Sequence, residues 1–282
     1  MRRIGILSTA YLDRYGLYEG AQKLKEHGYD CIDYQGFMHT EDPLFGLSAK
    51  DFEKELLHIR KACEGAGVGI SQAHGPWRFP PEDATEEQRA ERFEKMSRSI
   101  LGTSILGCEN FVIHPLMPFG ADQDPDPERY WEINFEFMSR LADVGQKHGV
   151  MVCFENLPMT KLSLSRTADA LRFVKAVNHP YLRMCLDVGH CAVFGELPAD
   201  AVRLLGKEYL RVMHVHDNDG KGDLHWLPYA GVIDWDAFAK SLDEIGFDGT
   251  VSLETLIPEK DRPEEEIALA RMAKRIAGRD DV

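Results

Sequence analysis

The sequence predicts a (β/α)8 TIM barrel, and three observations lead to this fold class. Eight short apolar runs alternate with longer amphipathic stretches along the 282 residues. The apolar runs are nearly continuous, which is typical of parallel strands buried on both faces. The amphipathic stretches end in glycine, the residue favoured at a left-handed helix C-cap. Eight strand–helix units of this kind close most simply into a barrel, a fold of about 250 residues.

The expected elements follow one another in a regular order. Helical periodicity is clearest at residues 49–67, 85–107 and 134–149. Pro198 and Pro263 stand near the starts of two later helices, because the first helical turn has no need of the N–H that proline lacks. The strands are predicted at residues 3–8, 30–35, 68–74, 110–115, 150–156, 182–190, 210–217 and 249–255.

An open doubly wound sheet is the alternative to the barrel, since it also alternates strands with helices. However, no GxGxxG motif follows the first predicted strand, and eight units are more than such a sheet usually needs. No linker, low-complexity tract or charge run divides the chain. We therefore expect residues 1–282 to form a single barrel domain.

Composition narrows the classes of function. A formal net charge of -14 without a basic patch disfavours binding to nucleic acid or to anionic membranes. The six cysteines show no CxxC spacing, and the chain has neither a signal peptide core nor a run of about 18 apolar residues. These features predict a cytoplasmic protein with reduced thiols and a small-molecule partner. Whether the chain forms a homo-oligomer is left open.

Residue types that bind metals or move protons gather at the ends of the predicted strands. The first two strands end in Ser8 and Gln35, which are merely polar. The C-terminal ends of barrel strands meet at one rim, where barrel enzymes have their active sites. One histidine there is more often structural, but six histidines beside three carboxylates favour a common site. From the third strand onward these residues are His74, His114, Glu155, Asp187, His190, His214, His216 and Glu254, with His225 in a following loop.

Strand alternation indicates which of these side chains meet. Neighbouring strand residues point to opposite faces, so Glu155 shares a face with Cys153 and Asp187 with Cys185. If the small thiols fill the barrel interior, the acids stand above them at its mouth. Glu155, Asp187, His216 and Glu254 can then surround one ion. Three carboxylates and an imidazole suit Mn²⁺, Mg²⁺ or Co²⁺, with Zn²⁺ as a further choice. The alternative, acids paired with Arg or Lys, finds no basic residue at the facing strand ends.

Five segments resemble the xylose-isomerase-like superfamily of divalent-metal barrels. They are FENLP (154–158), CLDVGH (185–190), MHVHDNDG (213–220), DLHWLPYAGVIDW (223–235) and SLET (252–255). That superfamily includes sugar isomerases, ketose 3-epimerases, inosose dehydratases and endonuclease IV. The resemblance covers nearly the whole chain, and as a set its motifs are specific for the superfamily but weak for the individual reaction.

The resemblance implies metal ligands and a mechanism. It makes Glu155, Asp187, His216 and Glu254 the metal ligands, Glu155 and Glu254 the proton-transfer pair, and His190 a group that binds substrate oxygens. A metal that chelates a carbonyl and its neighbouring hydroxyl acidifies the C–H between them and stabilises a cis-enediolate. One carboxylate then removes the proton and the other returns it. We therefore predict a sugar isomerase or epimerase, with Mn²⁺ as the favoured ion.

The residues expected to line the substrate pocket are less specific. Trp77 and Trp226 suit packing against the apolar face of a sugar or cyclitol, although ordinary rim packing explains them equally well. His74 and His114 are expected beside them, and residues 77–83 follow the third strand as a lid over the mouth. Lys161 and Gly222 stand where the ketose epimerases carry a glutamate and an arginine. Lys161 could meet an anionic group of the substrate, but a solvated loop lysine is the alternative.

Two other reactions fit the same residues. A lyase of the inosose dehydratase kind would use the same four ligands and the same proton abstraction. In endonuclease IV, residues matching His190, Asp223 and His225 hold an additional zinc, and histidines matching His74 and His114 hold another. The net charge and the lack of a basic face disfavour a nuclease, because DNA enzymes need several Lys or Arg contacts to phosphate. A metal role for His214 is left open.

Overall fold

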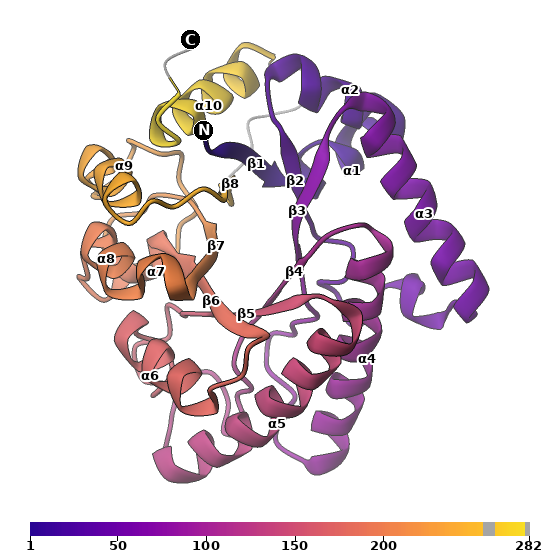
Figure 1. The fold of residues 1–282 in the computed structure, drawn as a ribbon. Helices are drawn as coiled ribbons and strands as arrows, with labels where there is room; N and C mark the ends of the chain where they lie inside the picture. The colour runs from indigo at the N-terminus through magenta and orange to yellow at the C-terminus, as the bar shows by residue number, and fades with distance from the viewer. Residues whose placement is uncertain (256–262, 280–282) are drawn as a thin grey trace.

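The computed structural model describes residues 1–255 and 263–279, and these form a TIM barrel (Figure 1). All strand pairs are parallel, in the order β7-β6-β5-β4-β3-β2-β1-β8. The strands are β1 (Arg3–Leu7), β2 (Cys31–Tyr34), β3 (Gly69–His74), β4 (Asn110–Ile113), β5 (Met151–Glu155), β6 (Leu182–Asp187), β7 (Leu210–His214) and β8 (Thr250–Leu253).

Just beyond β7 the chain reaches β8. Val215 donates its N–H to the Ser252 carbonyl at 2.8 Å and accepts from the Glu254 N–H at 3.0 Å. This bridge closes the barrel at the end where the strands finish, and it places the residues after β7 next to those after β8.

Helices surround the barrel on the outside (Figure 1). They are α1 (Leu12–Tyr15), α2 (Leu17–His27), α3 (Ala49–Ala66), α4 (Glu86–Ile105), α5 (Pro127–His148), α6 (Thr167–Val177), α7 (Val188–Val193), α8 (Pro198–Tyr209), α9 (Trp235–Glu244) and α10 (Pro263–Ile276), with 3-10 turns η1 (Ser8–Ala10) and η2 (Pro43–Gly46). The expected glycine caps are present, since Gly28, Gly67 and Gly149 all end helices in the left-handed region.

Two hydrophobic clusters stabilise the fold. The larger one fills the layer between strands and helices, where each fully buried aliphatic or aromatic side chain contributes about 1.5–3 kcal/mol. The smaller one consists of Val112, Cys153, Cys185 and Val212. As strand alternation predicts, small apolar and thiol side chains from β4 to β7 lie together beneath the acids.

Several expected boundaries were wrong by two residues or more, and two of them have a clear physical reason. The strand predicted at 182–190 ends at Asp187, because the Asp187 carboxylate accepts the His190 N–H at 2.7 Å and begins α7. The helix predicted at 134–149 begins seven residues earlier, at Pro127, because Asp126 caps it and proline suits its first turn.

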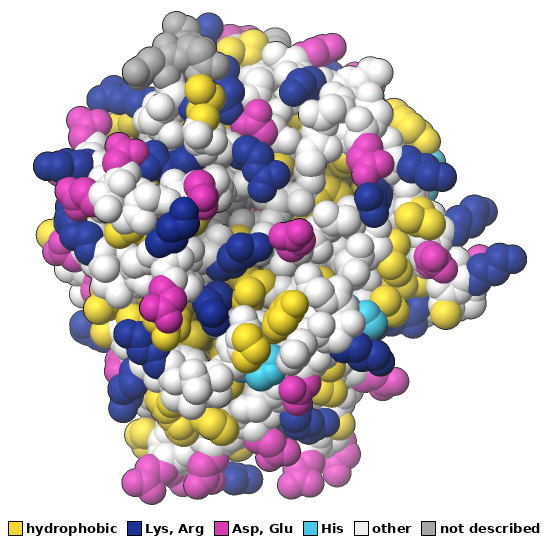
Figure 2. Space-filling model, in the orientation of Figure 1, with side chains coloured by type: hydrophobic (Ala, Val, Ile, Leu, Met, Phe, Trp, Pro, Cys, Tyr) yellow, Lys and Arg dark blue, Asp and Glu magenta, His cyan; other side chains and the backbone are white. Residues whose placement is uncertain are grey.

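The surface is mixed in charge. Figure 2 shows Lys and Arg side chains interspersed with Asp and Glu over the face in view, rather than gathered into a basic patch. Within the described residues, no helix combines the length and apolarity needed to span a membrane.

Candidate metal centre and active site

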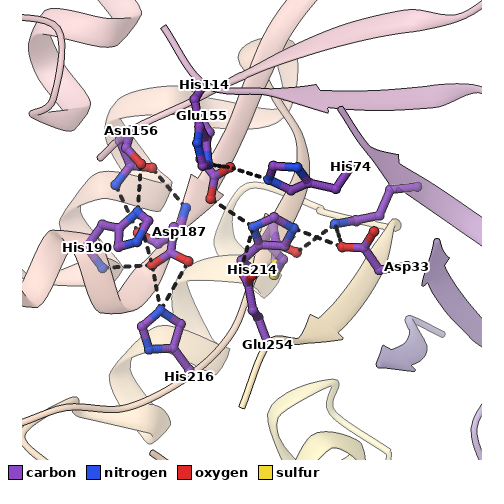
Figure 3. A network of polar contacts seen from close by, with 12 residues as sticks. Asp33, His74, His114, Glu155, Asn156, Asp187, His190, His214, His216 and Glu254 are labelled. Carbon is purple, nitrogen blue, oxygen red and sulfur yellow. Dashed lines mark hydrogen bonds and ion pairs between the residues drawn. The ribbon is translucent and has the colours of Figure 1, made fainter. Parts of the chain in front are cut away.

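Four strands deliver acids and histidines to the same end of the barrel. Glu155, Asp187 and His214 are the last residues of β5, β6 and β7, and Glu254 directly follows β8. All four are buried, and one ligand atom from each lies within 4.8 Å of the others. Figure 3 shows them turned toward one another above the barrel interior. The parallel register explains this convergence, because it brings the ends of neighbouring strands to one level.

His214 lies at the centre of the inner part of the site, which we call the inner cluster (Asp33, Glu155, His214 and Glu254). Its Nδ1 is 2.8 Å from Glu155 Oε1 and 2.8 Å from Glu254 Oε2. Its Nε2 is 2.9 Å from Oδ2 of Asp33, to which Gln72 also donates at 2.9 Å. Carboxylates only accept hydrogen bonds, so both ring nitrogens of His214 face acceptors.

Two further histidines approach the other oxygen of Glu155. His114 Nε2 lies 3.1 Å and His74 Nε2 3.5 Å from Glu155 Oε2. The Trp77 ring meets the His114 ring edge-on, with 5.1 Å between centroids. The expected grouping of His74, His114 and Trp77 beside the acids is therefore present. Glu155 Oε2 is nevertheless a buried oxygen without a hydrogen-bond donor of suitable geometry.

A second group lies on the outer side of the site, and we call it the outer cluster (Asp187, His190, His216, Asp223 and His225). Nε2 of His216 is 3.1 Å from Asp187. The Asp223 carboxylate lies 3.3 to 3.5 Å from Nε2 of His190, His216 and His225.

The glycine of the CLDVGH motif has a steric reason. A Cβ added to Gly189 would stand 2.0 Å from the His216 ring. Any larger residue at this position would therefore displace His216 from Asp187.

The loop after β7, which carries His216, Asp223 and His225, is anchored by polar contacts. Asp217 accepts hydrogen bonds from Trp235 Nε1 at 2.9 Å and from the Asn218 N–H at 2.9 Å. Asp219 accepts from the N–H groups of Lys221 and Gly222, and Gly220 adopts a positive φ of 77°. The turn expected at Asp219-Gly220 is confirmed.

Three histidines are oriented in the same way. Nδ1 of His74 donates to the Gly75 carbonyl at 2.9 Å, Nδ1 of His190 to the Asn156 carbonyl at 2.8 Å, and Nδ1 of His225 to the Glu254 carbonyl at 2.6 Å. Each ring therefore turns Nε2 toward the carboxylates. Backbone acceptors of this kind commonly orient histidines that ligate metals, because they fix the direction in which the second ring nitrogen points.

Asn156 links the ends of β5 and β6. Its side-chain Nδ2 donates to the Asp187 carbonyl at 3.0 Å, and its Oδ1 accepts the Asp187 N–H at 2.8 Å. Together with the hydrogen bond from His190 to its own carbonyl, Asn156 fixes two residues of the outer cluster (Figure 3). Nothing in the sequence pattern distinguished this asparagine from a turn residue.

The buried charges shift one another's pKa values. Burial alone would raise the pKa of Glu254, but the His214 ring beside it lowers that pKa to about 2. Burial would lower the pKa of His190, yet Asp187 and Asp223 raise it to about 10. His225 behaves similarly, and Asp223 raises its pKa to about 9 against the effect of burial. The Glu254 carboxylate is therefore held in the ionised form that metal binding requires.

The predicted site residues are brought together, but in a different grouping from the one expected. Glu155, Asp187 and Glu254 converge as predicted, yet the imidazole within 4.8 Å of all three belongs to His214. His216 contacts Asp187 and the outer cluster instead. This places Asp187 where the two clusters meet.

The remaining predicted residues lie farther out. Trp226 is half-buried, and its backbone pairs with that of Asp217. Lys161 is exposed in the loop after β5 and belongs to neither cluster.

Two residues of the site, Asp33 and Asn156, were not singled out from the sequence. His214 was named among the histidines at the strand ends, but its role was left open. The available signals were a buried acid inside an apolar strand and the alternation that places His214 and His216 on one face.

The donor set fits a divalent cation. Ligands 2.0–2.2 Å from a common ion lie roughly 3–3.5 Å apart, and one ligand atom each of Glu155, Asp187, His214 and Glu254 lies within 4.8 Å of the others. The ion-pair partners of Glu155, Asp187 and Glu254 among the described residues are all histidines. A buried acid without a permanently charged partner is unfavourable, and Oε2 of Glu155 has only the two histidines beside it and no hydrogen bond.

Comparison with known proteins identifies the family of the chain. The family model described as xylose isomerase-like TIM barrel matches residues 21–275. The chain belongs to this family.

Several known proteins are similar to this chain. It is 26% identical to a D-psicose 3-epimerase of Ruminiclostridium cellulolyticum over 205 residues, 70% of this chain and 67% of the relative. It is 23% identical to an inosose isomerase of Bacillus licheniformis over 257 residues, 88% and 87% of the two chains. The solved structure of the IOLI protein with a binding zinc atom has the same fold, with a TM-score of 0.77, 21% identity and 97% coverage of both chains.

Proposed function

We propose that this xylose isomerase-like protein is a divalent-metal-dependent isomerase or epimerase of a small sugar or cyclitol, with Glu155 and Glu254 as the proton-transfer pair. The observation that carries the proposal is the convergence of these two buried glutamates with Asp187, without any Lys or Arg ion-pair partner among the described residues. The relatives that act on psicose and inosose support the substrate class.

The proposed metal ligands are Glu155, Asp187, His216 and Glu254. His216 is preferred as the imidazole ligand because its Nε2 faces Asp187 at 3.1 Å, whereas both nitrogens of His214 already donate to carboxylates. The oxygen-rich set favours Mn²⁺, with Mg²⁺, Co²⁺ and Zn²⁺ as further choices, and the zinc of the IOLI protein supports a divalent ion.

The chain's own residues perform the proton transfers. When bound, the metal supplies Lewis acidity to a carbonyl and its neighbouring hydroxyl. Glu155 accepts the proton of the C–H beside the carbonyl, and the electron pair of that bond remains on the substrate as a cis-enediolate. Glu254, which comes from β8, returns a proton from the other side. Which of the two acts first depends on the face of the substrate that carries the hydrogen.

The surrounding residues bind and shield the substrate. We propose that His190 donates from Nε2 to a substrate oxygen, and that His74, His114, Trp77 and Trp226 line the pocket. The Lys161 side chain is exposed on the loop after β5, where it can meet an anionic substituent. The six cysteines are all buried and unpaired, which supports a reducing compartment such as the cytoplasm.

The lyase alternative shares every one of these residues, since an inosose dehydratase differs only in what the enediolate does next. A specific observation also favours a phosphodiesterase with several zinc ions. His74, His114 and Glu155 form one potential metal group, and His216, Asp223 and His225 form another. The mixed surface charge and the net charge of -14 weigh against binding to DNA.

Proton exchange in heavy water tests the proposal. The protein supplied with Mn²⁺ is incubated in D2O with a panel of ketoses and inososes, and NMR follows both deuterium incorporation beside the carbonyl and product formation. We expect incorporation and conversion for at least one sugar or cyclitol, and neither with the Glu155→Gln variant. Water loss from an inosose would assign the lyase reaction. Cleavage of an abasic-site DNA without exchange in any sugar would overturn the proposal.

A further inference from the structure

We propose that His214, anchored by Asp33, is a positioning residue that sets the separation of the two proton-transfer glutamates. The inference rests on the proposed function of Glu155 and Glu254. Its basis is one atom, His214 Nδ1, which lies 2.8 Å from an oxygen of each glutamate. Figure 3 shows the ring between the two carboxylates, with Asp33 on its far side.

The ring is held rigidly enough to act as a spacer. His214 is the last residue of β7, is completely buried and stacks on the His74 ring at 5.7 Å with 15° between planes. Its Nε2 is fixed by Asp33, which Gln72 orients in turn. A glutamate side chain has three rotatable bonds, so a shared rigid donor removes much of the freedom of both carboxylates.

The buried Asp33 carboxylate is explained by its contact with His214. It is completely buried on β2, and no Lys or Arg among the described residues forms an ion pair with it. A buried carboxylate without a basic partner is unfavourable, so a purely structural role would be filled better by an apolar residue. Its one ion-pair partner in the described chain is His214, which lies 181 residues away in the sequence.

The contacts divide the oxygens of Glu155 between two tasks. Oε1 is held by His214, whereas Oε2 points toward His74 and His114 and has no hydrogen-bond donor of suitable geometry. One oxygen is therefore used for positioning while the other stays available to the metal or the substrate. Glu254 likewise uses Oε2 for His214. Misplacing a reacting group by about 1 Å lowers a rate by about 100-fold, so a fixed distance between the two glutamates favours the reaction.

Two substitutions test the contacts of the two ring nitrogens of His214 one at a time. In His214→Asn the amide nitrogen can take the place of Nδ1 and keep the contact with the glutamates. In His214→Gln the amide reaches the place of Nε2, which keeps Asp33 but leaves the glutamates without their shared donor. His27→Gln is the matched control, because the His27 side chain is also largely buried beside an acid, 3.3 Å from Glu266, but lies at the end of α2, before β2 begins.

The readouts are the crystal structure of each metal-free variant, the affinity for Mn²⁺ by calorimetry, and the ratio of conversion to deuterium incorporation in D2O. We expect His214→Gln to fold, to show separated Glu155 and Glu254 carboxylates, and to lower the ratio at least about tenfold. Incorporation survives because one glutamate still removes and returns a proton on the same face. His214→Asn should lie between this variant and the wild type, and His27→Gln should match the wild type in all three readouts.

Unchanged glutamate positions and an unchanged ratio in His214→Gln would overturn the inference, as would equal losses of incorporation and conversion. If the wild type exchanges no sugar hydrogen, the proposed function fails instead. The crystal structures then decide the positioning role alone, because a His214→Gln structure with both carboxylates in place would refute it.

Discussion

The two ends of the barrel treat their carboxylates differently. At the N-terminal end, Glu109 pairs with Arg211 at 3.3 Å and Asp248 with Lys207 at 2.9 Å, all on exposed side chains. At the C-terminal end, Glu155, Asp187 and Glu254 are buried, and their ion-pair partners in the described chain are histidines only. Exposed ion pairs contribute about 0–1 kcal/mol each, and removing one changes little.

This difference separates residues that maintain the fold from residues that we propose to perform chemistry. A Lys or Arg beside a carboxylate neutralises its charge permanently, and the carboxylate is then not free to bind a metal or a substrate. A neutral histidine can instead be displaced by a metal or a substrate. The C-terminal end therefore gives up stability for reactivity, as barrel enzymes generally do at this face. Four expected outcomes test this contrast, beginning with the largest effect.

Glu155→Gln should abolish turnover, with a loss of about 10⁴-fold, because the amide cannot accept the substrate proton. The shape of the side chain is conserved, so circular dichroism and thermal unfolding should still report a folded barrel. Glu109→Gln, at the other end, should retain kcat within about twofold because it removes only an exposed ion pair. Substantial turnover by Glu155→Gln would remove this glutamate from the mechanism.

Chelation should be the next largest effect. Dialysis against EDTA is expected to remove activity, and Mn²⁺ should restore it without refolding. A metal that binds only the folded state stabilises it, so the Tm should rise with Mn²⁺ concentration. At 100 times the Kd, the free energy of unfolding should be higher by about 2.7 kcal/mol. Full activity and an unchanged Tm after exhaustive chelation would contradict a metal centre.

Sequence patterns predicted the fold well because they report local periodicity. Eight apolar runs and the glycine caps at Gly67 and Gly149 define parallel strand–helix units, and few other closed folds satisfy eight of them. The end of β6 was misplaced because Asp187 serves both as the last strand residue and as the cap of α7. A side chain with two such roles cannot be recognised from hydrophobic periodicity.

The sequence placed most of the acids and histidines at one end of the barrel, but it did not predict how deep each one lies. Alternation correctly places His214 and His216 on one face, but residues two apart are separated by roughly 6.6 Å along a strand. That distance decides which histidine meets the glutamates, and it depends on how the strands are staggered around the barrel. Asn156 was missed because its role is to bind the backbone of β6, and no pattern in its own segment contains that information.

Asn156→Ala sharpens the comparison further. Loss of both hydrogen bonds to the Asp187 backbone should weaken Mn²⁺ binding by about 10- to 100-fold, the effect typical of residues that orient ligands. Asn110→Ala is the control, since Asn110 also donates to a backbone carbonyl, that of Ser71, but at the start of β4. Calorimetry with Mn²⁺ measures both variants. Equal affinities for Asn156→Ala and the wild type would show that Asp187 is held by other contacts.

The smallest effect concerns a histidine outside the site. Burial lowers the pKa of His27, and the opposing charge of Glu266 does not compensate. A folded-state pKa below the unfolded value means that stability is present above the ordinary pKa of histidine and is lost as the pH falls through the folded-state value. The Tm advantage of the wild type over His27→Gln should therefore shrink between pH 7.5 and pH 5, by less than about 4 °C. An advantage that grows on acidification would show that Glu266 dominates instead.

We propose that the histidine-rich end of the barrel is a divalent metal centre for sugar chemistry. The most direct test is the metal content per chain, by mass spectrometry, of protein purified without a chelator or a histidine tag. We expect about one Mn, Mg or Co ion per chain, lost in the Asp187→Asn variant. Two or three zinc ions per chain would contradict the single-metal isomerase and favour the phosphodiesterase. A wild-type chain that takes up no divalent ion, even when dialysed against Mn²⁺, would contradict the metal centre itself.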